Sequence, residues 1–471
     1  MIYKKEGIKM DLKLYLLNYS VEGIKTLDQK VSLSFYKKII PNNLDTQEYN
    51  IKGIYGMNGS GKSGIVSSVD ILKNLLINPE YLNNPVIQNN LDAIINKKNK
   101  KLSIEAEFIT SVSPDIIYYY TITLTRDTSE KYVISYEELN AKKANSRTNS
   151  SEVLFKVADG EIQFAKKDEE NEQFYDRILN KMTNLLSRSS MCALFRNKAL
   201  ADLYEEILNN NRKEIDDLSA GLVLLMTLGT KLYIYLDESD DHRKYFVTKS
   251  FGTSDSLENN IPLFNEMLRY FFETENDYLN VISVSGNLVN KKAYKDYKRT
   301  VANLCEFLQI FKSDLQDIEI DKRENHDGYV CNLIMVYDSY KIHAEFESTG
   351  IKKLIKLFAY LREMVHGGIV FIDEFDSNLH DVYLCALLEY LMEYGKGQLC
   401  FTTHNLGPMD ILKRRKKSID FLSADHKIYP WIKSGNYSPS KLYRNGMIEG
   451  SPFNVDSTDF IGIFGTGEEN D

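Results

Sequence analysis

The 471-residue sequence lacks the features that define several common protein classes. No run approaches the ~18 to 20 uncharged apolar residues that cross a bilayer, and the first 13 residues lack the basic-then-apolar order of a secretory signal. The five cysteines are far apart and show no C-x-x-C spacing, which argues against a zinc site and a disulfide framework. We therefore expect a cytoplasmic protein with no membrane partner.

The sequence also lacks an excess of positive charge. Its net charge of −9 argues against binding nucleic acid over the whole surface. Two basic runs, residues 97–101 and 413–417, leave a local contact with nucleic acid open, although solvated loops are the favoured interpretation. The histidines show no metal-ligand spacing. Magnesium is the metal that the motifs below predict.

A phosphate-binding motif is present near the N-terminus. Residues 56–63 fit G-x-x-x-x-G-K-[ST] at every specified position. An apolar run at 51–55 precedes the motif and a 3.6-residue apolar period follows it, as expected for strand, loop and helix. Lys62 is expected to contact the β- and γ-phosphates and Ser63 to contact magnesium. The residues assigned to nucleotide binding here are Gly56, Asn58, Gly59, Ser60, Gly61, Lys62 and Ser63.

Two further strands end in polar residues. Residues 368–372 are apolar and are followed by Asp373 and Glu374, which is the Walker B arrangement: Asp373 would hold magnesium and Glu374 would act as general base toward water. Residues 399–403 end at His404, where ligands bind in open α/β sheets. His404 would sense the γ-phosphate. A solvated strand end and a structural histidine are the alternative interpretations.

The segment Glu347-Ser348-Thr349-Gly350 precedes an apolar-periodic helix. Ser348 could cap this helix. The segment also precedes Asp373 by 23 residues (373 − 350), and a helix N-terminus can grip a phosphate. The assignment of Ser348 and Gly350 to nucleotide binding is implied by the family resemblance described below. Gln88 is a guess for the Q-loop glutamine that the same resemblance implies.

The pattern along the chain predicts three regions. Residues 1–140 form an N-terminal lobe that carries the phosphate loop, with antiparallel strands within 102–136. Residues 141–314 read as an inserted, mainly helical domain, with helices such as 262–272 and 297–311. Residues 315–471 form a C-terminal lobe that carries the other motifs, with strands at 315–320 and 329–337 returning to the nucleotide core.

Together, these motifs resemble the ABC-type ATPases of the SMC and RecF-like class, and within it the OLD-like ATPases of bacterial abortive-infection and antiphage systems. Residues 371–380 resemble the Walker B and D-loop of that group, 401–405 its T-T-H-N loop, and 442–446 its closing tyrosine-arginine-glycine strand. The resemblance covers 1 to ~140 and ~315 to 471. It implies a P-loop NTPase fold of the ABC-type ATPase head, with an antiparallel β flank and an inserted helical domain.

The resemblance also implies a function. ATP and Mg²⁺ would be bound between two heads of a homo-oligomer, with Ser348 and Gly350 of one subunit facing Lys62 and Ser63 of the other, and ATP would be hydrolysed. The same group often carries a Toprim nuclease, for which the 67 residues after His404 (471 − 404) leave little room. We therefore expect an antiphage regulatory ATPase that controls a separate effector protein. A DNA-maintenance ATPase that clamps nucleic acid is the alternative.

Overall fold

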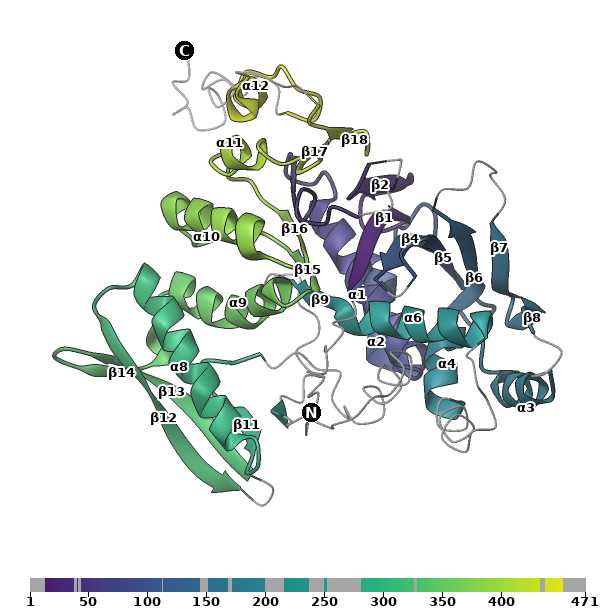
Figure 1. The fold of residues 1–471 in the computed structure, drawn as a ribbon, viewed down its shortest axis with the longest axis horizontal. Coiled ribbons are helices and arrows are strands. Elements are labelled where there is room, and N and C mark those ends of the chain that lie inside the picture. Colours follow the sequence, from purple (N-terminus) through teal and green to yellow (C-terminus); the bar gives the residue numbers. More distant parts are fainter. Residues whose placement is uncertain are drawn as a thin grey trace, which may run out of the picture.

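The computed structural model describes residues 13–451 apart from 38–39, 41–43, 112, 145–150, 168–171, 200–215, 237–249, 252–280, 326–327 and 433–436. Within these residues, three β-sheets and their flanking helices form an α/β fold (Figure 1). The predicted α/β class with an antiparallel flank is confirmed. Within the same residues, we find no helix long and apolar enough to cross a membrane.

The central sheet has the strand order β18-β17-β3-β16-β15-β9, and every pairing except that of β18 is parallel. Both faces of a parallel sheet are normally covered, and β15 and β16 are accordingly buried along their whole length. The carboxyl ends of β3, β15 and β16 therefore meet at one edge. The strands are β3 (Ile51–Gly56), β9 (Leu232–Tyr235), β15 (Ile369–Ile372), β16 (Gln398–Thr402), β17 (Ile419–Leu422) and β18 (Ile428–Pro430).

Each face of the central sheet packs into its own hydrophobic core. On β3, Ile54 belongs to the core shared with α1, whereas Tyr55 belongs to the core shared with α9 and α10. Successive side chains of a strand point to opposite faces, so the two cores lie on either side of the sheet (Figure 1). These helices are α1 (Lys62–Ile77), α9 (Thr349–Val365), α10 (Asp381–Tyr394) and the short α11 (Met409–Leu412).

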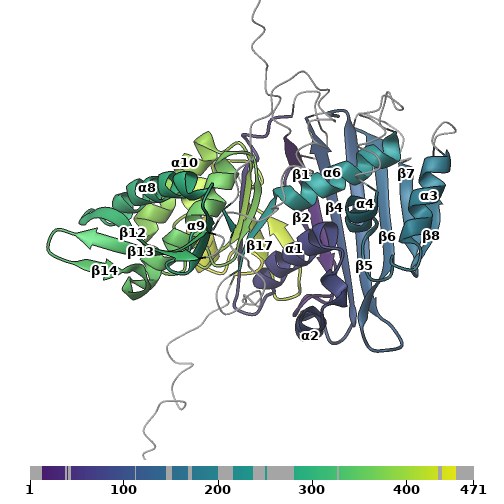
Figure 2. The ribbon, with the colours of Figure 1, turned by 90° about the horizontal axis from the view of Figure 1, so that it is seen from below.

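An antiparallel sheet in the order β2-β1-β4-β5-β6-β7-β8 covers the α1 side (Figure 2). The strands predicted within 102–136 are its central members. Two helices, α4 (Met191–Lys198) and α6 (Asp217–Lys231), join the same core. The strands are β1 (Leu14–Glu22), β2 (Val31–Ser34), β4 (Lys101–Thr110), β5 (Ile116–Arg126), β6 (Tyr132–Lys143), β7 (Glu152–Ala158) and β8 (Glu161–Ala165).

A third sheet lies beyond α9, with the order β10-β11-β13-β12 and with β14 paired to β13 (Figure 1). The strands predicted at 315–320 and 329–337 form β12 and β13, but they build this separate sheet and do not return to the central one. Helix α8 packs on β12 and on α9. The elements are β10 (Ser250–Phe251), β11 (Asn287–Asn290), β12 (Leu315–Asn325), β13 (Gly328–Tyr337), β14 (Lys341–His343) and α8 (Tyr294–Phe311).

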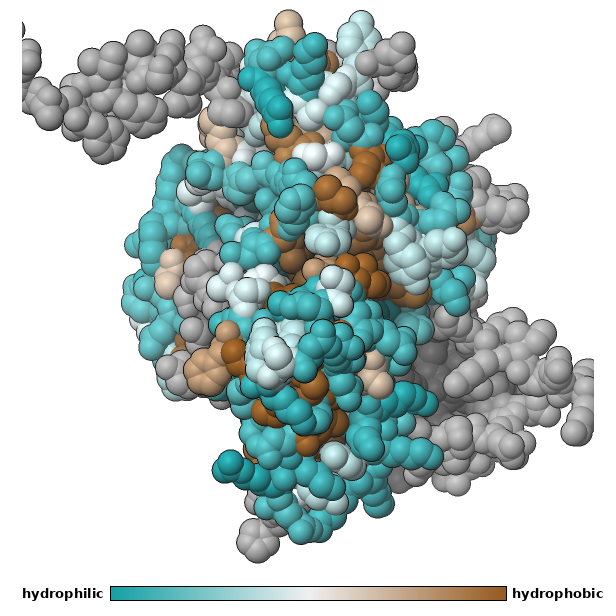
Figure 3. Space-filling view, turned by 90° about the vertical axis from the view of Figure 1, so that its left-hand side faces the viewer, coloured by the Kyte–Doolittle hydropathy of each residue, from teal (hydrophilic) through white to brown (hydrophobic). Residues whose placement is uncertain are grey.

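Aromatic side chains join the third sheet to the rest of the molecule. The ring of Phe307 on α8 lies 5.3 Å from that of Phe358 on α9, and Phe311 lies 5.2 Å from Tyr383 on α10. The surface on this side is mainly hydrophilic, with groups of hydrophobic residues among it (Figure 3). Such ring contacts stabilise a packed interface beyond their buried area. The contacts of Phe307 and Phe311 thus help to hold α9 between the central sheet and the third sheet.

Two expectations need correction. Residues 141–314 do contain helices, including α3 (Glu172–Met182), but β7 and β8 extend the antiparallel sheet and β9 is an edge strand of the central sheet. The described part of 141–314 is therefore divided among three sheets, and 262–272 lies outside the described residues. Residues 442–446, expected as a strand, lie in and just after helix α12 (Pro439–Arg444), because Ser438 caps it and Pro439 favours a first turn.

Candidate functional site

The motif residues from three distant parts of the sequence meet at the carboxyl edge of the central sheet. A pocket of about 400 Å³ opens there, which is within the size range of small-molecule sites. Its lining combines the phosphate loop with the residues that follow β15 and β16. The lining residues are Lys25, Thr26, Asn58, Gly59, Gly61, Lys62, Ser63, Gly64, Glu374, Thr402 and His404.

The phosphate loop positions Lys62 at the first residue of α1. Gly61 has a φ of 104°, and a Cβ there would lie 2.5 Å from Leu27 Cδ2, so both backbone and space require glycine. The Lys62 Nζ donates to the carbonyls of Gly56 at 2.9 Å and Met57 at 3.0 Å. Burial lowers the pKa of Lys62 to about 8, although Asp373, Glu374 and Asp376 oppose this. Among the residues that the structure describes, no carboxylate forms an ion pair with this ammonium at the pocket.

Asp373 and Glu374 differ in their access to the pocket. Asp373 is only 1% exposed and its Oδ1 accepts a 2.5 Å hydrogen bond from Thr402 Oγ1. The backbone N–H of Glu374 donates to the same Thr402 hydroxyl oxygen at 2.8 Å. Glu374 and Thr402 line the pocket, whereas Asp373 is not among the lining residues. This arrangement suits one carboxylate that acts directly on a ligand and one that acts through a hydroxyl or a water.

His404 lies on the pocket wall after β16. Burial lowers the pKa of its imidazole, and the nearby Lys62 lowers it further, against the opposing influence of Asp376 and Asp373. A neutral imidazole can donate one hydrogen bond and accept another. His404 can therefore contact a phosphate oxygen or a water without adding a second full charge beside Lys62.

Ser348 and Gly350 lie at the start of α9 and are not part of the pocket lining. The Ser348 Oγ accepts a hydrogen bond from the Ile351 N–H at 3.3 Å, so Ser348 does cap the helix. Gly56 and Ser60 are also absent from the lining. That Ser348 and Gly350 contact a nucleotide bound by another subunit stays a prediction.

The sequence interpretation missed four lining residues, Lys25, Thr26, Gly64 and Thr402. Lys25 and Thr26 follow β1, and the Thr26 Oγ1 donates to the Gly59 carbonyl at 3.2 Å. A loop that reaches the motif from another strand leaves no local signal. The guess at Gln88 is not supported, because its amide in α2 (Pro85–Ile94) donates to the carbonyls of Leu82 and Tyr132.

The donor set of the pocket fits Mg²⁺ with a nucleotide phosphate. Ser63 lines the pocket, and Asp373 accepts a hydrogen bond from the hydroxyl of the lining residue Thr402. In the described ranges no three His, Cys, Asp or Glu side chains gather as a metal cage. Magnesium typically keeps several waters and binds few protein oxygens together with substrate phosphates. Ser63 and Asp373 would hold such an ion, which would neutralise phosphate charge.

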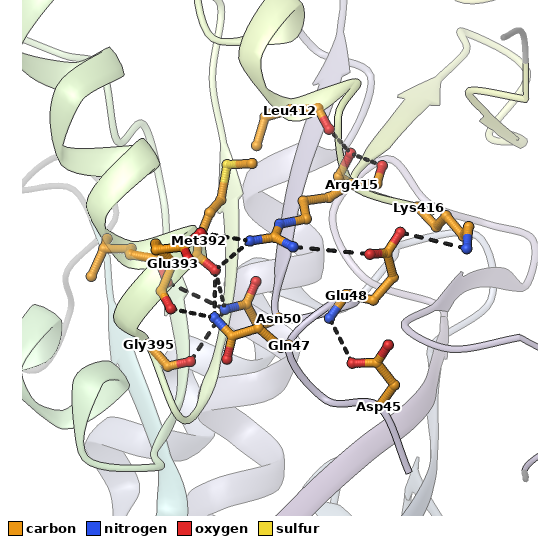
Figure 4. A network of polar contacts seen from close by, with 12 residues as sticks. Asp45, Gln47, Glu48, Asn50, Met392, Glu393, Gly395, Leu412, Arg415 and Lys416 are labelled. Atoms are coloured by element: carbon orange, nitrogen blue, oxygen red, sulfur yellow. Dashed lines mark hydrogen bonds and ion pairs between the residues drawn. The ribbon is translucent and has the colours of Figure 1, made fainter. Parts of the chain in front are cut away.

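The basic run at 413–417 lies at the opposite edge of the sheet, before β17, and is paired within the chain (Figure 4). Arg415 donates to the Met392 carbonyl at 3.0 Å and pairs with Glu48 and Glu393 at 3.9 and 3.4 Å. Lys416 pairs with Glu48 at 3.6 Å. The neighbouring Lys413 and Arg414 pair with Asp410 and Glu389. Lys97 and Lys98 in the other run pair with Asp92 and Asp28.

Comparison with known proteins finds a family model that matches one part of the chain. Residues 269–410 match the family described as "AAA domain, putative AbiEii toxin, Type IV TA system". The match covers less than half of the chain and includes Ser348, Gly350, Asp373, Glu374 and His404. It supports an ATPase of the AAA/ABC type at the level of that region. A search of curated protein sequences finds no match.

Solved structures share a general likeness with the whole chain. One is an Smc head bound to the C-winged helix domain of ScpA, with 13% identity and a TM-score of 0.38 over 89% of this chain and 98% of that one. Another is the recombination mediator protein RecF with ATP, with 11% identity and a TM-score of 0.34 over 89% of this chain and 100% of that one. At this level of likeness, the fold class rests on the strand order described above.

Proposed function

We propose that the protein binds and hydrolyses ATP at the carboxyl edge of the central sheet. One observation carries the proposal: Lys62, Glu374 and His404, which lie far apart in the sequence, line a single pocket beside the phosphate loop. In this proposal Lys62 binds the β- and γ-phosphates, and magnesium, when bound, neutralises their charge. Glu374 takes the proton of the attacking water, and His404 contacts the γ-phosphate.

Phosphate release from Mg–ATP tests this function. Glu374→Gln removes the base but keeps the side-chain volume, so we expect nucleotide affinity within about threefold and turnover lower by about 10² to 10⁴-fold. Glu389→Gln is the matched control, since Glu389 lies on α10 and pairs with Arg414. Turnover of Glu374→Gln equal to wild type would show that Glu374 is not the base.

For the biological role, we propose a regulatory ATPase of an antiphage system that acts in the cytoplasm. Two heads would hold ATP between them, with Ser348 and Gly350 of one facing Lys62 and Ser63 of the other, and would control a separate effector protein. The description of the matching family, which mentions a toxin of a toxin–antitoxin system, supports this role. Toxicity to the host cell should then depend on an intact ATP site. Toxicity that persists in both Lys62→Ala and Glu374→Gln would contradict the role.

A nucleic-acid clamp of the SMC and RecF-like kind is the second candidate. The basic runs at 97–101 and 413–417 first suggested it, but six of their cations pair with carboxylates of the same chain: Lys97, Lys98, Lys413, Arg414, Arg415 and Lys416. Paired cations release fewer counterions from DNA and so contribute less to binding. This candidate predicts an ATP-stimulated gel shift that weakens with salt. No shift at about 50 mM salt would exclude it.

A further inference from the structure

Glu374 adopts an unusual backbone conformation. Its φ is 48°, in the left-handed region, which is unfavourable for a residue other than glycine. Such conformations persist only where surrounding contacts hold them. On one side of the residue, the Thr402 hydroxyl accepts from the Glu374 N–H at 2.8 Å. The contact on the other side comes from a lysine to which the function above assigns no role.

That lysine is Lys353, in the second turn of α9. It is only 5% exposed, and its ammonium donates to the Glu374 carbonyl oxygen and to Ser377 Oγ. The Nζ also lies 5.8 Å from the centre of the Tyr235 ring. An ammonium is costly to bury, so its position depends on these partners as much as the turn depends on the lysine.

The first turn of α9 also contacts this backbone turn, residues 374–378, at its far end. The Thr349 Oγ1 donates to Asn378 Oδ1 at 3.2 Å. A Cβ on Gly350 would lie 2.5 Å from the Asn378 carbonyl oxygen, so only glycine allows this approach. Within the turn, the Ser377 N–H donates to the Glu374 carbonyl at 3.0 Å. Helix α9 thus holds both ends of the 374–378 turn.

We infer that Lys353 is a positioning residue for the hydrolysis proposed above. By holding the carbonyl of Glu374, it fixes the peptide plane that follows the residue and thereby the direction in which the Glu374 side chain leaves the backbone. Lys353 is not among the residues that line the pocket, so it acts through Glu374 and not on the nucleotide. A base displaced by about 1 Å can lose about 10²-fold in rate while the ligand still binds.

Lys353→Met tests this role, since methionine keeps an unbranched apolar stem and removes the ammonium. We expect kcat to fall about 10 to 10²-fold, with the affinity for a fluorescent ATP analogue within about threefold because the phosphate loop is intact. Lys353→Arg keeps a cation that can reach two acceptors and should recover part of kcat. Ser377→Ala, which removes one partner but leaves the lysine, should lower kcat less than Lys353→Met.

Lys73→Met is the matched control. Lys73 on α1 donates to the Leu232 carbonyl at 2.7 Å and lies 5.2 Å from the Tyr233 ring, so it makes the same kinds of contact at the far end of β9. It should leave kcat unchanged even if the melting temperature falls. Equal losses of kcat in Lys73→Met and Lys353→Met would mean that the effect is general destabilisation.

The outcomes separate this inference from the proposed function. If wild type hydrolyses ATP and Lys353→Met has the same kcat, the positioning role is wrong and the ATPase remains. If wild type shows no turnover, or Glu374→Gln does not lower it, the proposed function itself fails. Should Lys353→Met not fold, Ser377→Ala and Lys353→Arg decide: wild-type kcat in both would overturn the inference.

Discussion

The two edges of the central sheet both carry clustered polar residues, but they use them differently. At the carboxyl edge, the Lys62 ammonium donates to two backbone carbonyls and faces a pocket. At the amino edge, Arg415 and Lys416 pair with Glu48, and the buried Asn50 side chain donates to the carbonyls of Leu391, Met392 and Gly395 at 3.2 Å each (Figure 4). One edge is arranged for an incoming anion, whereas the other holds the chain together.

A run of positive charges in the sequence therefore does not mark the phosphate-binding site. The run 413–417 is more basic than the phosphate loop, yet its described side chains have partners within the chain. A single lysine at a helix start, with glycines beside it, leaves its charge for a ligand. Two features decide whether a cation is available to a ligand: the end of the strand at which it lies, and whether a carboxylate of the same chain already neutralises it.

Of the variants that compare the two edges, Lys62→Ala at the carboxyl edge has the largest expected effect. The variant removes the cation that faces the phosphates, so we expect the affinity for Mg–ATP, or kcat, to fall about 10² to 10³-fold. A binding titration and phosphate release measure the two. Lys416→Ala, which removes a lysine that is mostly exposed at the amino edge, should leave both unchanged. A similar loss in the two variants would erase the contrast between the edges.

The pH dependence of ATP binding tests the same lysine without a mutation. Because burial lowers the pKa of Lys62 to about 8, the free protein loses this positive charge as the pH rises through that value. ATP binding must then take up a proton, and the affinity should fall by up to about tenfold per pH unit above pH 8. The affinity measured from pH 7 to 9.5 checks this. A flat profile would mean that Lys62 keeps its proton or does not bind phosphate.

A smaller effect is expected at the amino edge. Arg415→Ala removes a hydrogen bond to the Met392 carbonyl and pairs with Glu48 and Glu393 from a side chain that is 20% exposed. We expect the free energy of unfolding to fall by about 1 to 2 kcal/mol, with ATP turnover unchanged. Arg414→Ala is the neighbouring control. Its side chain is 66% exposed, so the loss should be below about 1 kcal/mol.

The sequence predicted the parts of the site that depend on local pattern. The phosphate loop, Asp373-Glu374 and His404 each follow a short apolar run, and the rule that carboxyl ends of parallel strands share an edge brings them together. Pairing in the central sheet could not be read in the same way. The edge strand β9 has only four residues, follows α6 directly and pairs with β15 from a distant part of the chain. Its apolar residues therefore could not be told from a continuation of the helix.

The contacts that support the site were equally invisible to the sequence. Thr402 touches both Asp373 and Glu374, and Lys353 holds the Glu374 carbonyl from another helix. These contacts depend on the packing of α9 against the central sheet and not on spacing within a motif. Capping by Ser348, which was the alternative interpretation of the sequence, is observed, and it could be foreseen because capping is local. Its role toward a second subunit depends on an assembly and stays a prediction.

Melting curves with and without Mg–ATP compare the two edges most directly, in wild type, Lys62→Ala and Arg415→Ala. A ligand that binds only the folded protein stabilises it by about 2.7 kcal/mol at 100 times its Kd. We expect wild type and Arg415→Ala to gain the same increase in melting temperature from ATP, although Arg415→Ala starts lower, and Lys62→Ala to gain none. An equal increase in Lys62→Ala, or its loss in Arg415→Ala, would contradict the assignment of nucleotide binding to the carboxyl edge.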